Sequence, residues 1–340
     1  MVETFAAKVY RLQQVAAAGA KMQMLAADAR FDAIALEQLR ERARAELPPD
    51  IFDGLTDEDL ARFVVARSGS VDAALSQLKT ACTWRKTVLA SPPTCEVCEA
   101  NPSAHSHVPI GVEASERSTI FYGCPARATD QRVDPTVQHV GLALEHAFAL
   151  PSTGPRWVWC VDYHGFGLSH AAQGRLAARF ATLFSGCMPE RLHKIILLNP
   201  PLVFKARRPD PWPSGSAALG SPHAPRAKHQ CVDSADHLVY ASRLQVMLDA
   251  VRPFVDSVTL GKIVTLRGSN EVILAKLKDE HAFPPPTLLW MRATLETAPS
   301  QCLPPLPAGA AEQLLPGLRS VCPCEVSPEA EPGEIETANA

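Results

Sequence analysis

The sequence lacks any apolar run that approaches the ~20 residues needed to span a bilayer. Its first residues carry Glu3, Lys8 and Arg11 among alanines and lack the apolar core of a secretory signal. Neither sign of charge dominates, since the net charge of the 340 residues is −3, and such a balance gives no general attraction to nucleic acid. These absences predict a cytoplasmic protein with no nucleic-acid partner.

The motifs of common enzyme classes are also missing. There is no Gly-x-Ser-x-Gly elbow and no Gly-x-x-x-x-Gly-Lys phosphate loop. The turn Gly165-Phe-Gly167 lacks the third glycine of a dinucleotide site. Acid–base chemistry could be suggested by Asp162, His164, His170 and His193, and a nucleophile pair by Ser169 with His170, but no motif supports them. We therefore predict that the protein is not an enzyme and uses no nucleotide or other cofactor.

Ten cysteines are scattered along the chain, and we interpret most of them as free, buried thiols. Cys95-Glu-Val-Cys98, followed by His105 and His107, suggests a zinc site. The separation is shorter than the usual finger spacing, however, and the segment is rich in proline and serine. An irregular loop over residues 91–115, with no metal, is the interpretation we adopt.

Helical and strand patterns alternate along the rest of the chain. Thr56 followed by Asp59 predicts a helix start with an acidic first turn, with Arg62 and Arg67 on the polar face. A second helix is expected after the turn at 68–70. Further on, short apolar runs alternate with helical patterns, which predicts an α/β domain with a mostly parallel sheet. The expected strands are 119–124, 157–162, 195–198 and 262–266, and the expected helices are 136–150, 169–187, 238–251 and 272–277.

Composition divides the chain into four parts. The first is rich in alanine and predicts one or two helices, and the last is crowded with prolines and ends acidic. A stretch rich in proline, serine and glycine predicts a disordered insertion at about 207–236. The expected parts are a helical extension 1–48, a helical region 49–90, an α/β lobe 91–283 and a disordered tail 284–340.

Four separated blocks, in order, resemble the CRAL-TRIO family. They are the helical block Leu60 to Lys86, the strand end Asp162-x-x-Gly165, the segment Pro189-Glu190-Arg191 to Asn199-Pro200-Pro201, and the segment Arg252-Pro253-Phe254 to Lys262-Ile263. The resemblance implies an N-terminal helical region followed by a lobe whose mostly parallel sheet floors an apolar lipid pocket. It also implies a mobile gate helix near 246–259.

The resemblance further implies which residues meet the ligand. In members that carry phosphatidylinositol, an Arg, a Glu, a Thr and a Lys hold the headgroup, and the matching positions here are Arg67, Glu190, Thr259 and Lys262. These residue types suit a phosphate and sugar hydroxyls. The expected pocket and gate residues are Trp157, Trp159, Phe204, Met247, Val251, Phe254 and Val255.

The resemblance implies a lipid-binding and lipid-transfer protein that holds one lipid, with phosphatidylinositol favoured, and that contacts membranes transiently. Trp157 and Trp159 stand where choline-carrying members have small hydroxyl residues, which argues against phosphatidylcholine. Two alternatives stay open. The tryptophans suit a sterol, tocopherol-like or retinoid ligand, and a filled pocket would leave a non-catalytic interaction scaffold.

Overall fold

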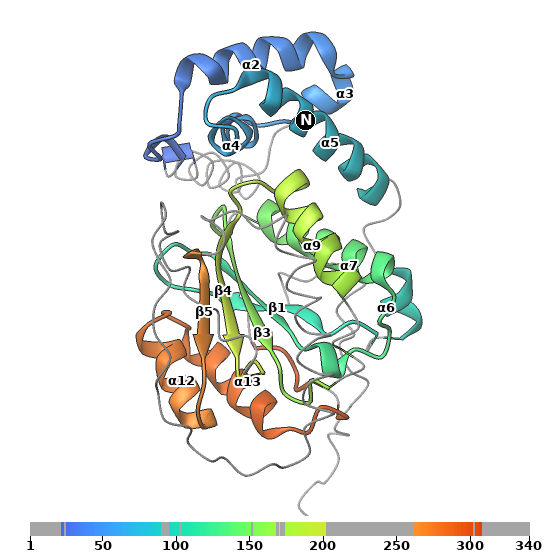
Figure 1. The fold of residues 1–340 in the computed structure, drawn as a ribbon, viewed down its shortest axis with the longest axis vertical. Helices are drawn as coiled ribbons and strands as arrows, with labels where there is room; N and C mark the ends of the chain where they lie inside the picture. The colour runs from blue at the N-terminus through green and yellow to red at the C-terminus, as the bar shows by residue number, and fades with distance from the viewer. Residues whose placement is uncertain are drawn as a thin grey trace, which may run out of the picture.

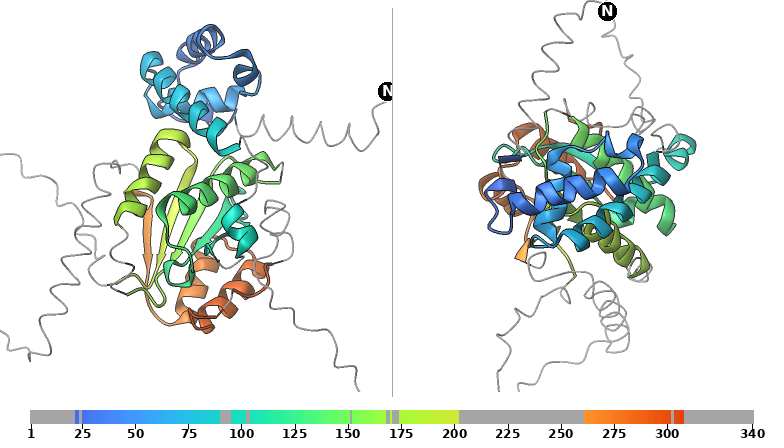
Figure 2. Two further views of the ribbon diagram at one scale, coloured as in Figure 1. Left: turned by 90° about the vertical axis from the view of Figure 1, so that its right-hand side faces the viewer. Right: turned by 90° about the horizontal axis from the view of Figure 1, so that it is seen from above.

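The computed structural model describes residues 22–307, except 24, 90–94, 102–103, 151, 168–169, 171–173, 202–260 and 302. A central five-stranded sheet carries helices on both faces, and a group of N-terminal helices lies at one end of it (Figures 1 and 2). The expected α/β class is confirmed. The predicted insertion at 207–236 and the predicted helix 238–251 lie outside the described residues.

The N-terminal helices are α2 (Ala33–Glu46), α3 (Pro49–Phe52), α4 (Asp57–Ala66) and α5 (Val71–Leu89). Helix α4 begins as predicted: the Thr56 side chain accepts from the Asp59 amide and the Asp59 carboxylate accepts from the Thr56 amide. Leu39, Phe63 and Leu78 are fully buried and join the apolar core of the lobe. These helices are therefore packed on the lobe through a shared core.

The sheet has the strand order β1-β2-β3-β4-β5, with β1 antiparallel to β2 and the remaining neighbours parallel. The predicted strands are all present, although β4 is longer than expected. The strands are β1 (His107–Val112), β2 (Thr119–Gly123), β3 (Trp157–Asp162), β4 (Leu192–Leu198) and β5 (Ile263–Leu266).

Alternate residues of each strand belong to two different cores, as the two-residue period of a strand requires. Ile120 and Ile196 lie in the core under α12 (Asn270–Asp279) and α13 (Pro285–Glu296). Phe121 and Trp157 lie in the opposite core, with α7 (Val133–Ala149) and α9 (Gly174–Cys187). The sheet is thus a middle layer, and the α7–α9 side is the one that also meets the N-terminal helices (Figure 1).

The prediction of an irregular loop over residues 91–115 is wrong. The segment contains the short helix α6 (Glu96–Ala100) and the strand β1. Val108 and Ile110 are buried, and Pro109 is tolerated because β1 is an edge strand. The proline and the polar neighbours concealed an alternating strand pattern.

The predicted disordered tail from residue 284 onward is also wrong in its first part. Helix α13 packs on the sheet, with Trp290 edge-on to Tyr122 at 5.1 Å between ring centroids. The guanidinium of Arg127 donates to the carbonyls of Thr294 and Thr297, both at 2.7 Å, and so closes the end of α13. Proline at the start of a helix is favourable, so the prolines mark its beginning and not a tail. Residues 308–340 lie outside the described residues.

Candidate functional site

The sheet face toward α7 and α9 carries a cluster of aromatic side chains. Trp157 is fully buried, with its ring centroid 5.8 Å from that of Phe148 and 5.0 Å from that of Phe184. Trp159 is half-buried and meets Phe180 and Phe184 edge-on, each at 5.1 Å. Trp157 is therefore part of the core, and Trp159 lies at the edge of this core, where it is partly exposed.

Beyond Trp159 the same face becomes steadily more exposed. The strand register places Phe121, Trp159, Ile195 and Ile263 in one row across β2 to β5. Phe121 is fully buried, Trp159 and Ile195 are half-buried, and Ile263 is 38% exposed. We call Trp159, Ile195, Leu197 and Ile263 the open apolar strip. A contiguous, partly exposed apolar surface of this kind is typical of a binding site.

A polar group lies at the end of the sheet where β4 and β5 begin. Glu190 follows α9 in a left-handed conformation (φ 57°), in the turn before β4. Its two carboxylate oxygens accept from the guanidinium of Arg30 at 2.9 and 3.0 Å. Lys262 precedes β5, and its Nζ donates to the carbonyl of Leu192 at 2.8 Å.

Arg30, which the sequence did not single out, is held on two sides. Its guanidinium also donates to Asp28 at 2.8 Å, and that hydrogen bond holds the pKa of Asp28 below its usual value. The charge of Lys262 lowers the pKa of Asp28 further. The carboxylates of Asp28 and Glu190 in turn raise the pKa of Arg30. Two acids and two bases therefore meet at this edge, and the chain before α2 supplies half of them.

Arg67 has a different local role from the one expected beside Glu190. Its Nε donates to Gln77 Oε1 at 2.8 Å, and Gln77 donates to the carbonyl of Ser185 at 2.6 Å. This chain of bonds joins α4, α5 and α9. The remaining predicted headgroup, pocket and gate residues lie outside the described residues: Thr259, Phe204, Met247, Val251, Phe254 and Val255.

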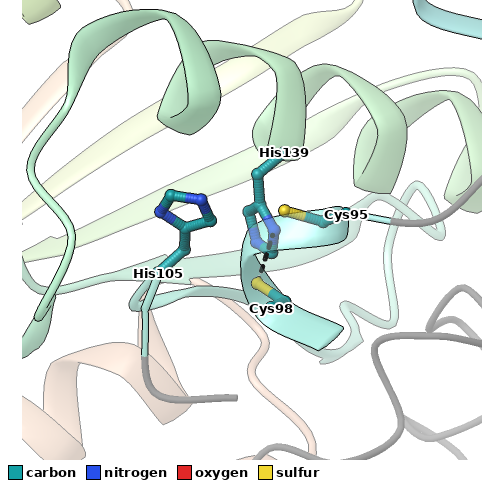
Figure 3. Close-up of side chains that lie close together, drawn as sticks. All are labelled: Cys95, Cys98, His105 and His139. Atoms are coloured by element: carbon teal, nitrogen blue, oxygen red, sulfur yellow. Dashed lines mark hydrogen bonds between the residues drawn. The ribbon is translucent and has the colours of Figure 1, made fainter. Parts of the chain in front are cut away.

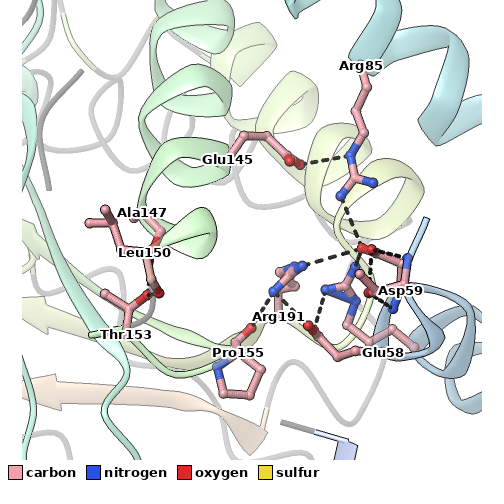
Figure 4. A network of polar contacts seen from close by, with 11 residues as sticks. Glu58, Asp59, Arg85, Glu145, Ala147, Leu150, Thr153, Pro155 and Arg191 are labelled. Atoms are coloured by element: carbon pink, nitrogen blue, oxygen red, sulfur yellow. Dashed lines mark hydrogen bonds and ion pairs between the residues drawn. The ribbon is translucent and has the colours of Figure 1, made fainter. Parts of the chain in front are cut away.

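A buried charge network joins the N-terminal helices to the lobe (Figure 4). Arg62 is 1% exposed, so its assignment to a polar surface of α4 is wrong. The carboxylates are Glu58, Asp59 and Glu145, and the guanidinium groups are Arg62, Arg85 and Arg191. Their formal charges cancel. The sequence gives no signal for this network beyond the i, i+3 and i, i+4 spacing on α4.

Within the network, burial by itself would raise the pKa of Asp59, but Arg62, Arg85 and Arg191 outweigh it and hold that pKa well below its usual value. Arg191 also lies over the ring of Phe148 at 4.1 Å and donates to the carbonyl of Pro155 at 3.1 Å. Burial lowers the pKa of Arg191 to about 10. The network thus stabilises the negative charge of Asp59, whereas burial disfavours the positive charge of Arg191.

Two of the residues considered for acid–base chemistry, Asp162 and His170, have structural partners. Asp162 accepts from the Tyr122 hydroxyl at 2.7 Å and from the His164 amide at 2.9 Å. His170 Nδ1 accepts from the Gly167 amide at 3.0 Å. These bonds fix the turn after β3. A separate group of metal-ligand type, Cys95, Cys98, His105 and His139, lies between α6 and α7.

Comparisons with known proteins identify the domain. The model of the CRAL/TRIO domain matches residues 110–207, a range that contains β2, β3 and β4. A solved structure described as the crystal structure of Sfh5 shares 16% identity, with a TM-score of 0.43, over 69% of this chain and 81% of that one. No curated protein matches the chain. None of the helices in the described residues is long and apolar enough to cross a membrane. On this match, residues 110–207 belong to a CRAL/TRIO domain.

Proposed function

We propose that this protein binds one lipid, preferentially phosphatidylinositol, and transfers it between membranes without a covalent step. The observation that carries the proposal is the CRAL/TRIO match over β3 and β4, which bear Trp159, Ile195 and Leu197 of the open apolar strip. The domain match supports a lipid-binding or lipid-transfer protein; the identity of the lipid is our proposal. We place this activity in the cytoplasm, with transient contact to a membrane surface.

The acyl chains would lie along the open apolar strip. Each methylene group removed from water gains about 0.8 kcal/mol, so one 16-carbon chain gains on the order of 12 kcal/mol at full burial. The strip as described exposes Ile263 to 38%, so a covering element is needed for that burial. We propose that the segment near 246–259 supplies this cover as a gate and moves aside at a membrane.

The headgroup would lie at the polar end of the strip, where β4 and β5 begin. Arg30 and Lys262 provide the cationic donors that a phosphate requires, and Glu190 provides acceptors for inositol hydroxyls. Arg30 now occupies both oxygens of Glu190. The other edge of this guanidinium donates to Asp28, so one N–H of Nη1 remains, and Arg30 would reach a phosphate through it or by releasing one of the two carboxylates.

Native mass spectrometry with lipid extraction tests the proposal directly. The purified protein is incubated with liposomes of phosphatidylcholine that contain phosphatidylinositol, and its bound lipid is identified. We expect one phosphatidylinositol per protein in the wild type and its loss in Glu190→Ala/Lys262→Ala. Lys194→Ala is the matched control, because it removes a lysine of the same sheet whose Nζ contacts His281. Equal binding by the double variant and the control would refute the headgroup assignment.

A second candidate is a sterol, tocopherol-like or retinoid ligand. The observation that favours it is the aromatic cluster, in which the indole Nε1 of Trp159 is buried without a hydrogen-bond partner among the described residues. A flat apolar ligand with one hydroxyl or carbonyl group would satisfy that donor. The same extraction distinguishes the candidates, since it identifies the bound molecule. A purified protein that carries no lipid and extracts none from liposomes would instead favour a non-catalytic interaction scaffold.

A further inference from the structure

Four side chains of the types that bind zinc meet between α6 and α7. Cys95 precedes α6, Cys98 lies within it, His105 lies in the segment before β1, and His139 lies on α7 (Figure 3). One ligand atom from each residue lies within 4.8 Å of all the others. The sequence pattern alone pairs the two cysteines with His105 and His107. The fold instead brings His139, 34 residues beyond His105, to the fourth position.

The ring of His139 is oriented as a metal ligand would be. Its Nε2 lies 2.8 Å from the carbonyl of His107, and a carbonyl can only accept, so Nε2 carries the proton. The lone pair of Nδ1 is then free to face Cys98 Sγ, 3.4 Å away. A backbone carbonyl that holds the far nitrogen of a ligating histidine in this way is typical of zinc sites.

One ring nitrogen of His105 has no hydrogen-bond partner among the described residues. Its Nδ1 lies 3.5 Å from the Thr136 hydroxyl, whereas its Nε2 is buried without a hydrogen-bond partner in the described part of the chain. Figure 3 shows one nitrogen of this ring turned toward His139 and Cys95. An unpaired polar atom in the interior is costly, and a metal ion at the centre of the cluster would satisfy it.

The dimensions and the charge of the cluster also suit zinc. Zinc–sulfur bonds of ~2.3 Å and zinc–nitrogen bonds of ~2.0 Å in a tetrahedron place the ligand atoms roughly 3.3–3.8 Å apart. The present separations of up to 4.8 Å need only a small contraction. Two thiolates and two neutral imidazoles cancel the charge of one Zn²⁺, so the complex would be neutral in a largely apolar interior.

We propose that Cys95, Cys98, His105 and His139 bind one Zn²⁺ as a closed structural site. Two cysteines and two histidines complete a tetrahedron, and the four residues are between 2% and 6% exposed, which leaves no open position for a substrate. The ion would fasten α6 and the start of β1 to α7. It would stabilise the edge of the sheet independently of any lipid on the open apolar strip.

Metal analysis of the full-length protein is the first test. Elemental analysis and native mass spectrometry of protein purified without chelator should show close to one zinc per chain. After removal by a chelator, the protein should take up one Co²⁺ and show the intense visible bands of tetrahedral cobalt together with thiolate charge transfer. Zinc-loaded wild type should unfold about 5 °C or more above the metal-free form.

Variants locate the site. Cys98→Ser and His139→Gln should each lose zinc and the cobalt bands, whereas Cys82→Ser, which removes a buried thiol of α5, should retain both. If the site variants fail to fold, the cobalt spectrum of the wild type and the effect of the chelator on its melting temperature still test the proposal. Folded wild-type protein that binds less than about a tenth of an equivalent of zinc or cobalt would overturn the proposal. A Cys95–Cys98 disulfide in freshly purified protein, or retention of zinc by Cys98→Ser/His139→Gln, would overturn it as well.

Discussion

Asp59 offers the sharpest test of the buried charge network. Its carboxylate lies 3.6 Å from Arg85 and 3.7 Å from Arg191 and also pairs with Arg62 of its own helix. Asp59→Asn preserves the size of the side chain and an acceptor for the helix start. It leaves three guanidinium groups with only two carboxylates, and so creates an uncompensated positive charge in the interior. Because such a charge cannot be solvated, we expect a loss of about 3–5 kcal/mol in the free energy of unfolding.

Urea unfolding followed by circular dichroism measures this loss. Asp57→Asn is the matched control, since Asp57 lies on the same turn of α4 but is 64% exposed and pairs only at the surface with Arg40. Its cost should stay below about 1 kcal/mol. Adding Arg191→Met to Asp59→Asn should recover about 1–3 kcal/mol, because it removes the excess charge and burial already disfavours the charge of Arg191.

A cost of Asp59→Asn no larger than that of Asp57→Asn would refute the role of Asp59 as a buried charge partner. A double variant Asp59→Asn/Arg191→Met that is less stable than Asp59→Asn alone would refute that role as well, since the two losses of stability would then add instead of compensating.

The free energy of unfolding at acidic pH gives an independent check on the role of Asp59. The folded pKa of Asp59 is lowered below its unfolded value of ~3.9, so its contribution to stability is complete above that value. The contribution is lost as the pH falls through the folded pKa. The wild type should therefore be no less stable at pH 5 than at pH 7 on account of this group and should weaken below about pH 4. In Asp59→Asn the weakening below that pH should be smaller.

Three further predictions concern the rest of the fold and site. Trp157→Ala should cost about 3–5 kcal/mol in urea unfolding because the indole is fully buried against two phenylalanines; a cost under about 1 kcal/mol would contradict its place in the core. Truncation after Phe283 should expose the sheet face under α13 and raise binding of a hydrophobic dye, whereas truncation after residue 307 should leave dye binding unchanged. Arg30→Ala should weaken extraction of phosphatidylinositol several-fold with little change in melting temperature, since Arg30 is about a third exposed; unchanged extraction would remove it from the headgroup site.

Local sequence determined the elements that form from neighbouring residues. The start of α4 follows from Thr56 and Asp59, which bond each other across one turn. The parallel strands follow from short apolar runs such as Ile195 to Leu198, separated by helical patterns. The early prolines of α13 and Pro109 in β1 misled the prediction, because proline is compatible with a helix start and with an edge strand as well as with a loop.

The tertiary structure alone decided which side chains meet. Arg62 carries a charge that a helical pattern assigns to the surface, yet it is buried with its partners Glu58 and Asp59 of the same helix. Arg85, Glu145 and Arg191 of other elements complete the network around these two carboxylates. Arg30 reaches Glu190 from 160 positions away, and His139 joins Cys95 and Cys98 across the gap between two helices. Sequence patterns report periodicity within one element. Ion pairs and metal ligands depend on distances between elements, which only the packed chain defines.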